Sequence, residues 1–254
     1  MMAEAESIKT QKRILFVRHG ITEMNEVLSK HKWGAKSFVE AVGMRDTVLS
    51  SSGVIHANNV NKLIHTITPI ALNEIELVVA TGLTRTLQTA ERIWDGTHVM
   101  TEPSLKRMVQ PLLAERLYLS SDQGRTREML EAEFPAWDFE NLAHNEEWWY
   151  NHDPETHGEY DEWRPPGTYY CQAEPDDVFK ARMIKAKEWL LARPESTIAG
   201  RYRGEEEQQI TDPLLFNSRS KTVRRTAFLF KRSLIRRTIY PSNHRQTRAW
   251  RLIG

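Results

Sequence analysis

Cysteine is almost absent from the sequence. Cys171 is the only cysteine among 254 residues, and a single cysteine cannot form an intrachain disulfide. A cysteine-based metal site would need several thiolates, which the chain does not have. We therefore expect neither a disulfide framework nor thiol redox chemistry.

Long apolar runs are absent as well. No stretch approaches the roughly 18 to 20 apolar residues that a membrane span needs, and residues 1–13 are charged, with no apolar signal core behind them. Hydrophobic residues make up 40% of the chain and charged residues 27%, which is close to the averages of soluble globular proteins. We expect a folded cytoplasmic protein with no membrane partner.

The C-terminal part is poor in acidic residues. Residues 199–254 hold 13 Lys and Arg but 4 Asp and Glu, a net charge of +9, whereas residues 1–198 carry a net charge of −8. A basic segment can bind nucleic acid or an acidic membrane, but these basic residues are scattered among apolar ones without a recognisable binding motif. We therefore expect a domain over 1–199 and a basic, poorly ordered tail over 200–254, with no nucleic-acid partner.

The order of apolar patterns predicts an α/β fold. Short apolar runs at 14–17 and 75–80 suit parallel strands that are buried on both faces. Residues 50–67 read as a helix with Ser52 as a possible cap and with Ile55, Val60, Leu63 and Ile64 on one side. Residues 84–94 read as another helix. The alternation of strand and helix predicts a doubly wound sheet.

Two further segments precede the tail. Residues 174–193 form an amphipathic helix pattern with Phe179, Met183, Ala186 and Leu190 on one stripe. Residues 136–173 are rich in aromatic and acidic residues without clear periodicity and are interpreted as an insertion or lid. Its aromatic side chains either bind a ligand or, as we favour, pin an irregular segment to the core. The spacing of its His152 and His157 does not suit a metal site.

Charged side chains follow the two predicted strands. Arg18 and His19 come directly after the first strand, with Gly20 in the next position, and Arg85 lies in the turn and helix after the second. Ligands of open α/β sheets bind beyond the carboxyl ends of the strands. Two guanidinium groups can hold one phosphate by bidentate hydrogen bonds. The pattern predicts an anion site.

Four sequence blocks carry a family resemblance. RHGITEMN (18–25), DTVLSSSGVIHA (46–57), ATGLTRTLQTA (80–90) and LLAERLYL (112–119) occur in this order. They resemble the histidine phosphatase superfamily, the phosphoglycerate mutase-like proteins of eukaryotic type, over roughly residues 12–199. The third block has Thr81 and Gly82 where the family has Ser-Pro.

The resemblance implies a fold and a mechanism. The fold is a three-layer α/β/α sandwich with a mostly parallel, doubly wound sheet. His19 is the implied nucleophile, and Glu115 is the implied general acid and base. The implied phosphate ligands are Arg18, Gly20, Thr22, Asn25 and Arg85. The implied reaction is hydrolysis of a small phosphorylated metabolite without metal or cofactor, with phosphomutase activity as an alternative. The oligomeric state is left open.

One expected element of the family is not found in the sequence. The family has a second histidine after the next core strand, but the residues after PESTIA read GRYRGEEE, and His244 lacks both the apolar strand before it and the glycine after it. We therefore expect the last core strand to be missing and the C-terminal part to be replaced or truncated. A catalytically impaired phosphate-binding scaffold is the alternative function that follows.

Overall fold

The centre of the molecule is a five-stranded parallel sheet. The computed structural model describes residues 12–30, 44–68, 70–117, 119–144, 147–149, 174–201 and 223–227. The strand order is β3-β2-β4-β1-β5, and all four neighbouring pairs are parallel. The strands are β1 (Lys12–Val17), β2 (Leu77–Ala80), β3 (Lys106–Val109), β4 (Thr197–Arg201) and β5 (Val223–Ala227).

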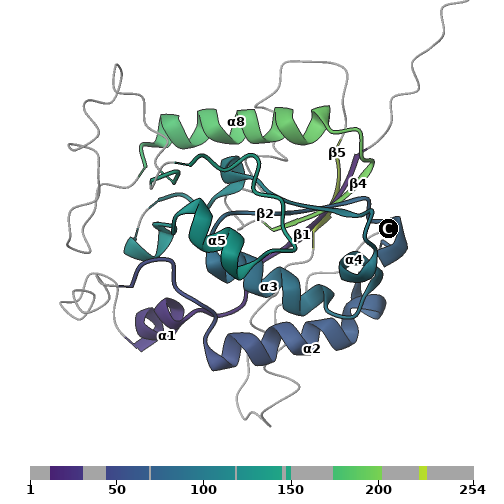
Figure 1. Ribbon diagram of the computed structural model, residues 1–254, viewed down its shortest axis with the longest axis horizontal. Coiled ribbons are helices and arrows are strands. Elements are labelled where there is room, and N and C mark those ends of the chain that lie inside the picture. The colour runs from purple at the N-terminus through teal and green to yellow at the C-terminus, as the bar shows by residue number, and fades with distance from the viewer. Residues whose placement is uncertain are drawn as a thin grey trace, which may run out of the picture.

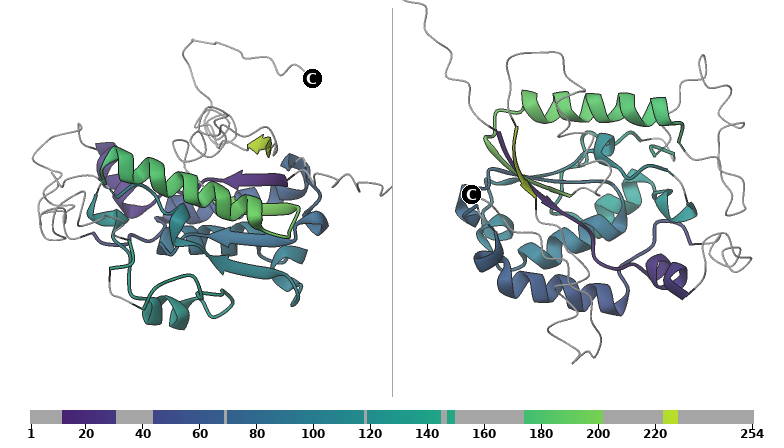
Figure 2. Two further views of the ribbon diagram at one scale, coloured as in Figure 1. Left: turned by 90° about the horizontal axis from the view of Figure 1, so that it is seen from above. Right: turned by 180° about the vertical axis from the view of Figure 1, so that it is seen from behind.

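Helices cover both faces of this sheet, as the sequence predicted (Figure 1). One face carries α2 and α3, and the opposite face carries α8; Figure 2 shows α8 lying across the strands from above. The α-helices are α1 (Glu23–Lys30), α2 (Ser51–Ile67), α3 (Thr84–Trp94), α4 (His98–Thr101), α5 (Arg127–Glu133) and α8 (Asp176–Ala192). Three short 3-10 helices are η2 (Leu72–Glu74), η3 (Pro111–Leu113) and η4 (Ser120–Asp122). The three-layer α/β/α class is confirmed.

The core is divided by the sheet because successive strand residues point to opposite faces. In β1, Ile14 and Phe16 belong to one buried cluster, and Leu15 and Val17 belong to the other. The predicted stripe of the long helix is confirmed, since α8 contributes to the first cluster the buried side chains of Phe179, Met183, Ala186 and Leu190. Each face of the sheet therefore has its own apolar layer.

Helix α2 differs from its sequence prediction in two details. Its N-cap is Ser50, whose hydroxyl accepts a hydrogen bond from the Gly53 amide, and not Ser52. Ser52 instead donates to the Glu26 carboxylate at 2.6 Å. Ile55 and Leu63 are exposed on the helix surface, because the buried stripe of α2 runs instead through Gly53, Ala57, Val60 and Ile64.

The last core strand is present, which corrects the expectation that it is missing. Strand β4 lies between β1 and β2, where Ile198 is paired with Ile14 and with Leu77. The buried side chains of Ile198 and Ala199 and the backbone of Gly200 are compatible with this central position. The charges that follow Ala199 in sequence misled the prediction, because Arg201 is the final residue of the strand.

Two observations bear on the predicted boundary between residues 199 and 200. The boundary falls inside β4, and β5 lies within the predicted tail and pairs with β1. The division into a domain and a tail stays a prediction for the other residues after 201. Among the described helices, none has the length and apolar composition to cross a bilayer.

The identity of the α2 cap gives a first test. Replacing Ser50 by Ala should lower the free energy of unfolding by about 1 kcal/mol, because the Gly53 amide loses its acceptor. Chemical denaturation would measure the loss. Ser51→Ala, at an exposed neighbouring position, is the matched control and should change stability little. A larger loss for Ser52→Ala than for Ser50→Ala would contradict this assignment of the cap.

Candidate active site

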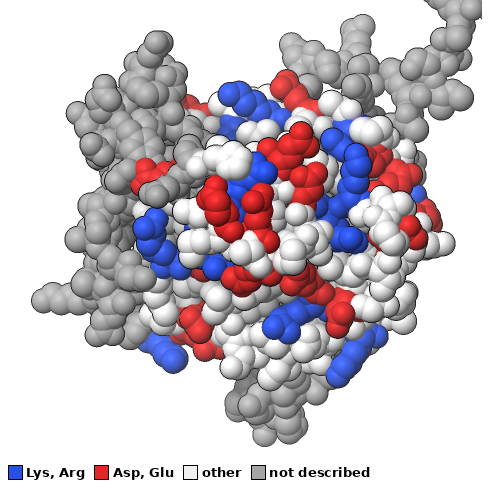
Figure 3. All heavy atoms as spheres, viewed as in Figure 1, with Lys and Arg blue, Asp and Glu red and all other residues white. Residues whose placement is uncertain are grey.

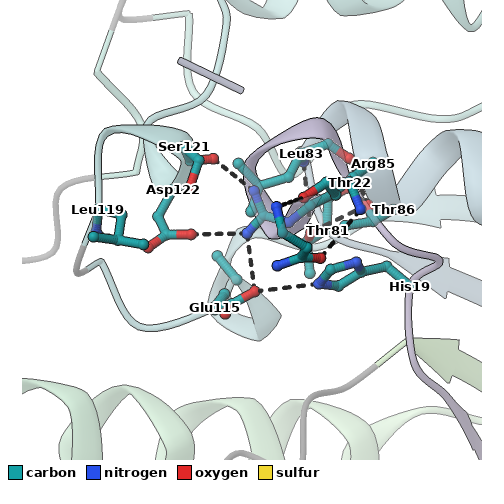
Figure 4. Close-up of polar contacts among 12 residues, drawn as sticks. His19, Thr22, Thr81, Leu83, Arg85, Thr86, Glu115, Leu119, Ser121 and Asp122 are labelled. Atoms are coloured by element: carbon teal, nitrogen blue, oxygen red, sulfur yellow. Dashed lines mark hydrogen bonds and ion pairs between the residues drawn. The ribbon is translucent and has the colours of Figure 1, made fainter. Parts of the chain in front are cut away.

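The predicted site residues meet at one edge of the sheet. Strand β1 ends at Val17 and is followed by Arg18 and His19, and β2 is followed by a three-residue turn and α3, which carries Arg85. Because the strands are parallel, their carboxyl ends lie on the same edge. Glu115 reaches this edge from the segment after η3. The structure thus brings His19, Arg85 and Glu115 together (Figure 4).

The imidazole of His19 is held in one orientation. Its side chain is 5% exposed, and its Nδ1 lies 2.5 Å from the Gly20 carbonyl oxygen. Since a carbonyl oxygen only accepts, Nδ1 is assigned the proton and donates it. In the neutral ring this leaves the lone pair on Nε2, which lies 3.8 Å from Glu115 Oε2. Nε2 is therefore the ring nitrogen whose lone pair is available for chemistry.

Arg85 is a buried cation surrounded by acceptors. Its Nη2 lies 2.9 Å from Glu115 Oε2 and 2.9 Å from Asp122 Oδ1, and its Nη1 donates to the Ser121 carbonyl at 2.6 Å. Burial by itself would lower the pKa of Arg85, but the carboxylates of Glu115 and Asp122 outweigh burial and raise the pKa. The guanidinium therefore stays charged inside the protein.

Asp122 and Ser121 are site residues that the sequence analysis missed. They lie in η4, and the Asp122 Oδ2 atom accepts a hydrogen bond from the Leu119 amide at 2.9 Å. An aspartate that closes a short turn is common in loops, so its sequence position carried no sign that its other oxygen faces a buried arginine. The contact spans 37 residues along the chain and depends on the tertiary fold.

The backbone before Glu115 is anchored from the opposite face of the sheet. Arg182 of α8 donates to the carbonyl oxygens of Leu112 at 3.0 Å and Ala114 at 2.7 Å. The same guanidinium pairs with the buried carboxylate of Glu174. These bonds fix the main chain from which the Glu115 side chain projects.

Three of the predicted phosphate ligands have structural roles of their own. Thr22 and Asn25 cap helix α1 reciprocally, because each backbone amide donates to the other's side chain at 3.1 Å. The Gly20 amide donates to Thr89 Oγ1 at 3.0 Å, and Thr89 in turn donates to the Arg85 carbonyl. These contacts tie the loop after β1 to α3.

Arg18 differs from Arg85 in its surroundings. It is exposed and lies with His19 and Asn25 on the wall of a cavity of about 410 Å³. The same wall includes Glu26 and His56, and its apolar part includes Ala57, Val60 and Ile93. One predicted arginine is therefore fixed inside the protein, and the other lies at a solvent-accessible wall.

The start of α3 is fixed by another buried carboxylate, that of Asp46. Asp46 Oδ1 accepts a hydrogen bond from the Thr84 amide at 2.8 Å, and its Oδ2 lies 3.1 Å from Arg125 Nε. Asp46 has a positive φ of 41°, a backbone region that costs energy for most residues. Burial raises the pKa of Asp46, and the bonds from Thr84 oppose that effect. This cluster positions the helix end next to Arg85.

The described part of the predicted insertion packs on the turn before Arg85. Trp148 and Trp149 are both buried, and Trp148 Nε1 donates to the Arg125 carbonyl at 2.7 Å. A Cβ atom added to Gly82 would lie 2.8 Å from the Trp148 ring. These contacts fit the prediction that the aromatic residues pin the segment to the core. His152, His157 and His244 lie outside the described residues.

Comparisons with known proteins find similarity only among solved structures. No protein-family model and no curated protein matches the chain. The chain is similar to the ecdysone phosphate phosphatase of Bombyx mori, solved with tungstate, with a TM-score of 0.43 at 16% identity over 77% of this chain and 74% of that one. For the alpha-ribazole phosphatase of Shigella flexneri the TM-score is 0.40 at 16% identity, over 78% and 77% of the two chains.

A third similar structure is a phosphoglycerate mutase. The protein from Bacillus anthracis has a TM-score of 0.40 at 17% identity, over 82% of both chains. All three similarities are thus at low sequence identity. Within the described ranges, no group of three or more His, Cys, Asp or Glu side chains is arranged to hold a metal ion.

The packing of Trp148 on Gly82 is open to a direct test. Gly82→Ala should lower the free energy of unfolding by about 1 to 3 kcal/mol, because the new methyl group overlaps the indole ring. Thermal melting and tryptophan fluorescence would report the loss and the displaced ring.

A double-mutant cycle separates this overlap from other effects of the substitution. In a Trp148→Leu background, Gly82→Ala should cost much less, since the smaller side chain leaves room for the methyl group. An equal cost in both backgrounds would show that the indole ring is not what limits the size of residue 82.

Proposed function

We propose that this chain hydrolyses a small phosphomonoester without metal, through a phosphohistidine at His19, as its resemblance to the histidine phosphatase superfamily implies. The observation that carries the proposal is the orientation of His19. Its Nδ1 is satisfied by the Gly20 carbonyl, and its Nε2 lies 3.8 Å from the Oε2 atom of Glu115, which pairs with the guanidinium of Arg85. A neutral imidazole fixed in this way is a suitable nucleophile for phosphorus.

The first step forms one bond and breaks another. The Nε2 lone pair of His19 attacks phosphorus in line with the ester oxygen, and the bond from phosphorus to that oxygen breaks. Protonated Glu115 donates its proton to the leaving alkoxide. In the second step Glu115, now ionised, takes a proton from water while the water attacks the phosphohistidine. Inorganic phosphate leaves, and His19 is restored.

The arginines stabilise charge in both steps. Negative charge spreads over the equatorial oxygens of the transferring group, and fixed donors that meet it there lower the barrier. Arg85 is rigidly held for this role. In this proposal Arg18, which lines the cavity beside His19, receives the phosphate as it enters. We assign the chain a small phosphorylated metabolite as substrate and the cytoplasm as its compartment.

Hydrolysis is favoured over transfer to a second substrate. A mutase must shield its phosphohistidine from water, whereas Arg18 is exposed beside His19 in this protein.

The distribution of charge on the surface argues against a nucleic-acid substrate. In Figure 3, acidic side chains gather near the middle of the viewed face, over α5 and its surroundings, so the described part of this face offers no continuous basic surface.

A phosphate-binding scaffold with impaired catalysis is the second candidate. The observation that favours it is the sequence after β4, where Tyr202, Arg203 and Gly204 follow Arg201, and no histidine occurs between residues 158 and 243. The resemblance implies a second histidine at this place to support the transferring phosphoryl group. A scaffold would bind phosphate with the residues described here and would release none from esters.

Phosphate release decides between the two candidates. We expect the full chain to release inorganic phosphate from p-nitrophenyl phosphate or from a panel of sugar phosphates and phosphoglycerates in the presence of a chelator. His19→Ala should lower the rate on the order of a thousandfold or more, since the nucleophile is lost. His65→Ala, at an exposed position of α2, is the matched control and should leave the rate unchanged.

A trapped intermediate would identify the nucleophile. Rapid acid-free quenching should yield a phosphorylated protein whose label is lost in acid and absent from His19→Ala. Folded protein that binds phosphate but never becomes labelled would support the scaffold. Full activity in His19→Ala would refute the proposed mechanism.

A further inference from the structure

The guanidinium of Arg85 has few donors left for a ligand. Arginine has five N–H donors, two of them on each terminal nitrogen. Both protons of Nη2 are directed to carboxylates, one to Glu115 and one to Asp122, and one proton of Nη1 goes to the Ser121 carbonyl. When arginine binds a phosphoryl group by two hydrogen bonds, at least one of the two donors is a terminal nitrogen, Nη1 or Nη2. A phosphoryl group at the Nη2 nitrogen must therefore displace a carboxylate.

The two carboxylates contact different parts of the site. Asp122 is anchored in its own turn, because its Oδ2 accepts from the Leu119 amide while its Oδ1 contacts Arg85. The neighbouring Ser121 carbonyl holds the same guanidinium from the same turn. The Oε2 atom of Glu115, in contrast, points at Arg85 and at the reactive nitrogen of His19, which is where the phosphoryl group must enter. Glu115 is the partner that an entering anion meets.

We propose that Asp122 is a positioning residue that keeps Arg85 in place, and that Glu115 is its exchangeable partner, released with uptake of one proton when a phosphoryl group binds. This inference rests on the proposed function. In this inference Asp122 stays bound to Arg85 throughout, whereas Glu115 leaves Arg85 and returns to it in each catalytic cycle.

Electrostatics favours the proton uptake. Among the described residues, the charged and titratable groups that face Glu115 include Arg85 from α3, His19 from the end of β1 and, across the guanidinium, Asp122 from η4. Once the anion forms an ion pair with Arg85, Glu115 loses its cationic partner and gains a negatively charged neighbour. Both changes favour the neutral carboxylic acid. Binding of the substrate would thereby supply the proton that the general acid must donate.

Calorimetry of anion binding tests the inference without requiring turnover. The full chain is titrated with tungstate, a dianionic phosphate analogue, near neutral pH in buffers that differ in ionisation enthalpy. The dependence of the heat on the buffer gives the number of protons taken up. We expect about one proton for each bound anion in the unmodified protein. Glu115→Gln should bind tungstate at least as tightly and take up none.

Variants at His19 and Asp122 separate the remaining possibilities. His19→Asn should retain the uptake, whereas an uptake that disappears in this variant would place the proton on the imidazole and overturn the assignment. Asp122→Ala should weaken tungstate binding by about tenfold, and Asp122→Asn should restore most of it, because asparagine keeps an acceptor for Arg85. Equal affinities for Asp122→Ala and the unmodified protein would show that Asp122 does not position the arginine.

The outcomes for the inference and for the proposed function are distinct. Tungstate binding without proton uptake, or with uptake that persists in Glu115→Gln, overturns the exchange and leaves phosphate chemistry at His19 intact. A folded protein, verified by its thermal transition, that binds neither tungstate nor inorganic phosphate overturns both.

Discussion

The rest of the site depends on one constraint, the burial of a positive charge at Arg85. A guanidinium taken out of water is stable only when acceptors surround it, and here they come from Glu115 and from the η4 turn. Those segments lie between β3 and α5, where the described residues form two short 3-10 helices and irregular chain. The arginine thus fixes the irregular part of the chain to the start of α3. The guanidinium of Arg85, which is suited to binding phosphate, therefore also holds Glu115 and the η4 turn in place.

A second buried ion pair serves the same site from the other face of the sheet. Arg182 of α8 pairs with Glu174, just before the helix, and its Nη1 donates to the main chain just before Glu115. The backbone of Glu115 is fixed from one side and its side chain from the other. Three buried carboxylates thus have separate partners: Asp122 holds Arg85, Glu174 holds Arg182, and Asp46 holds the start of α3. The fold alone would not specify the chemistry, which depends on these contacts.

Sequence reasoning was successful where a local pattern has a local cause. Helix α3 begins at Thr84 and ends at Trp94 as predicted, and the apolar stripe of α8 is buried as predicted. It failed where a contact between residues far apart in the sequence determines the local structure. Ser52 was predicted as the cap of α2, but the helix begins earlier and Ser50 is the cap. Gly200 and Arg201 were predicted to lie outside the sheet, but pairing with β1 makes them part of it. Asp122 was missed for the same reason, because nothing near it in sequence indicates Arg85.

The central place of β4 determines how the sheet depends on the chain after Arg201. This strand lies between β1 and β2, so its last residue, Arg201, is at the edge of the sheet where His19 and Arg85 lie. Strands β1 to β4 and the helices α2, α3 and α8 all come before residue 202 in the sequence. Among the described elements, β5 alone follows Arg201, and it joins the sheet by pairing with β1. A substitution in this described part of the final segment therefore acts on the sheet at β5, which β1 separates from β4.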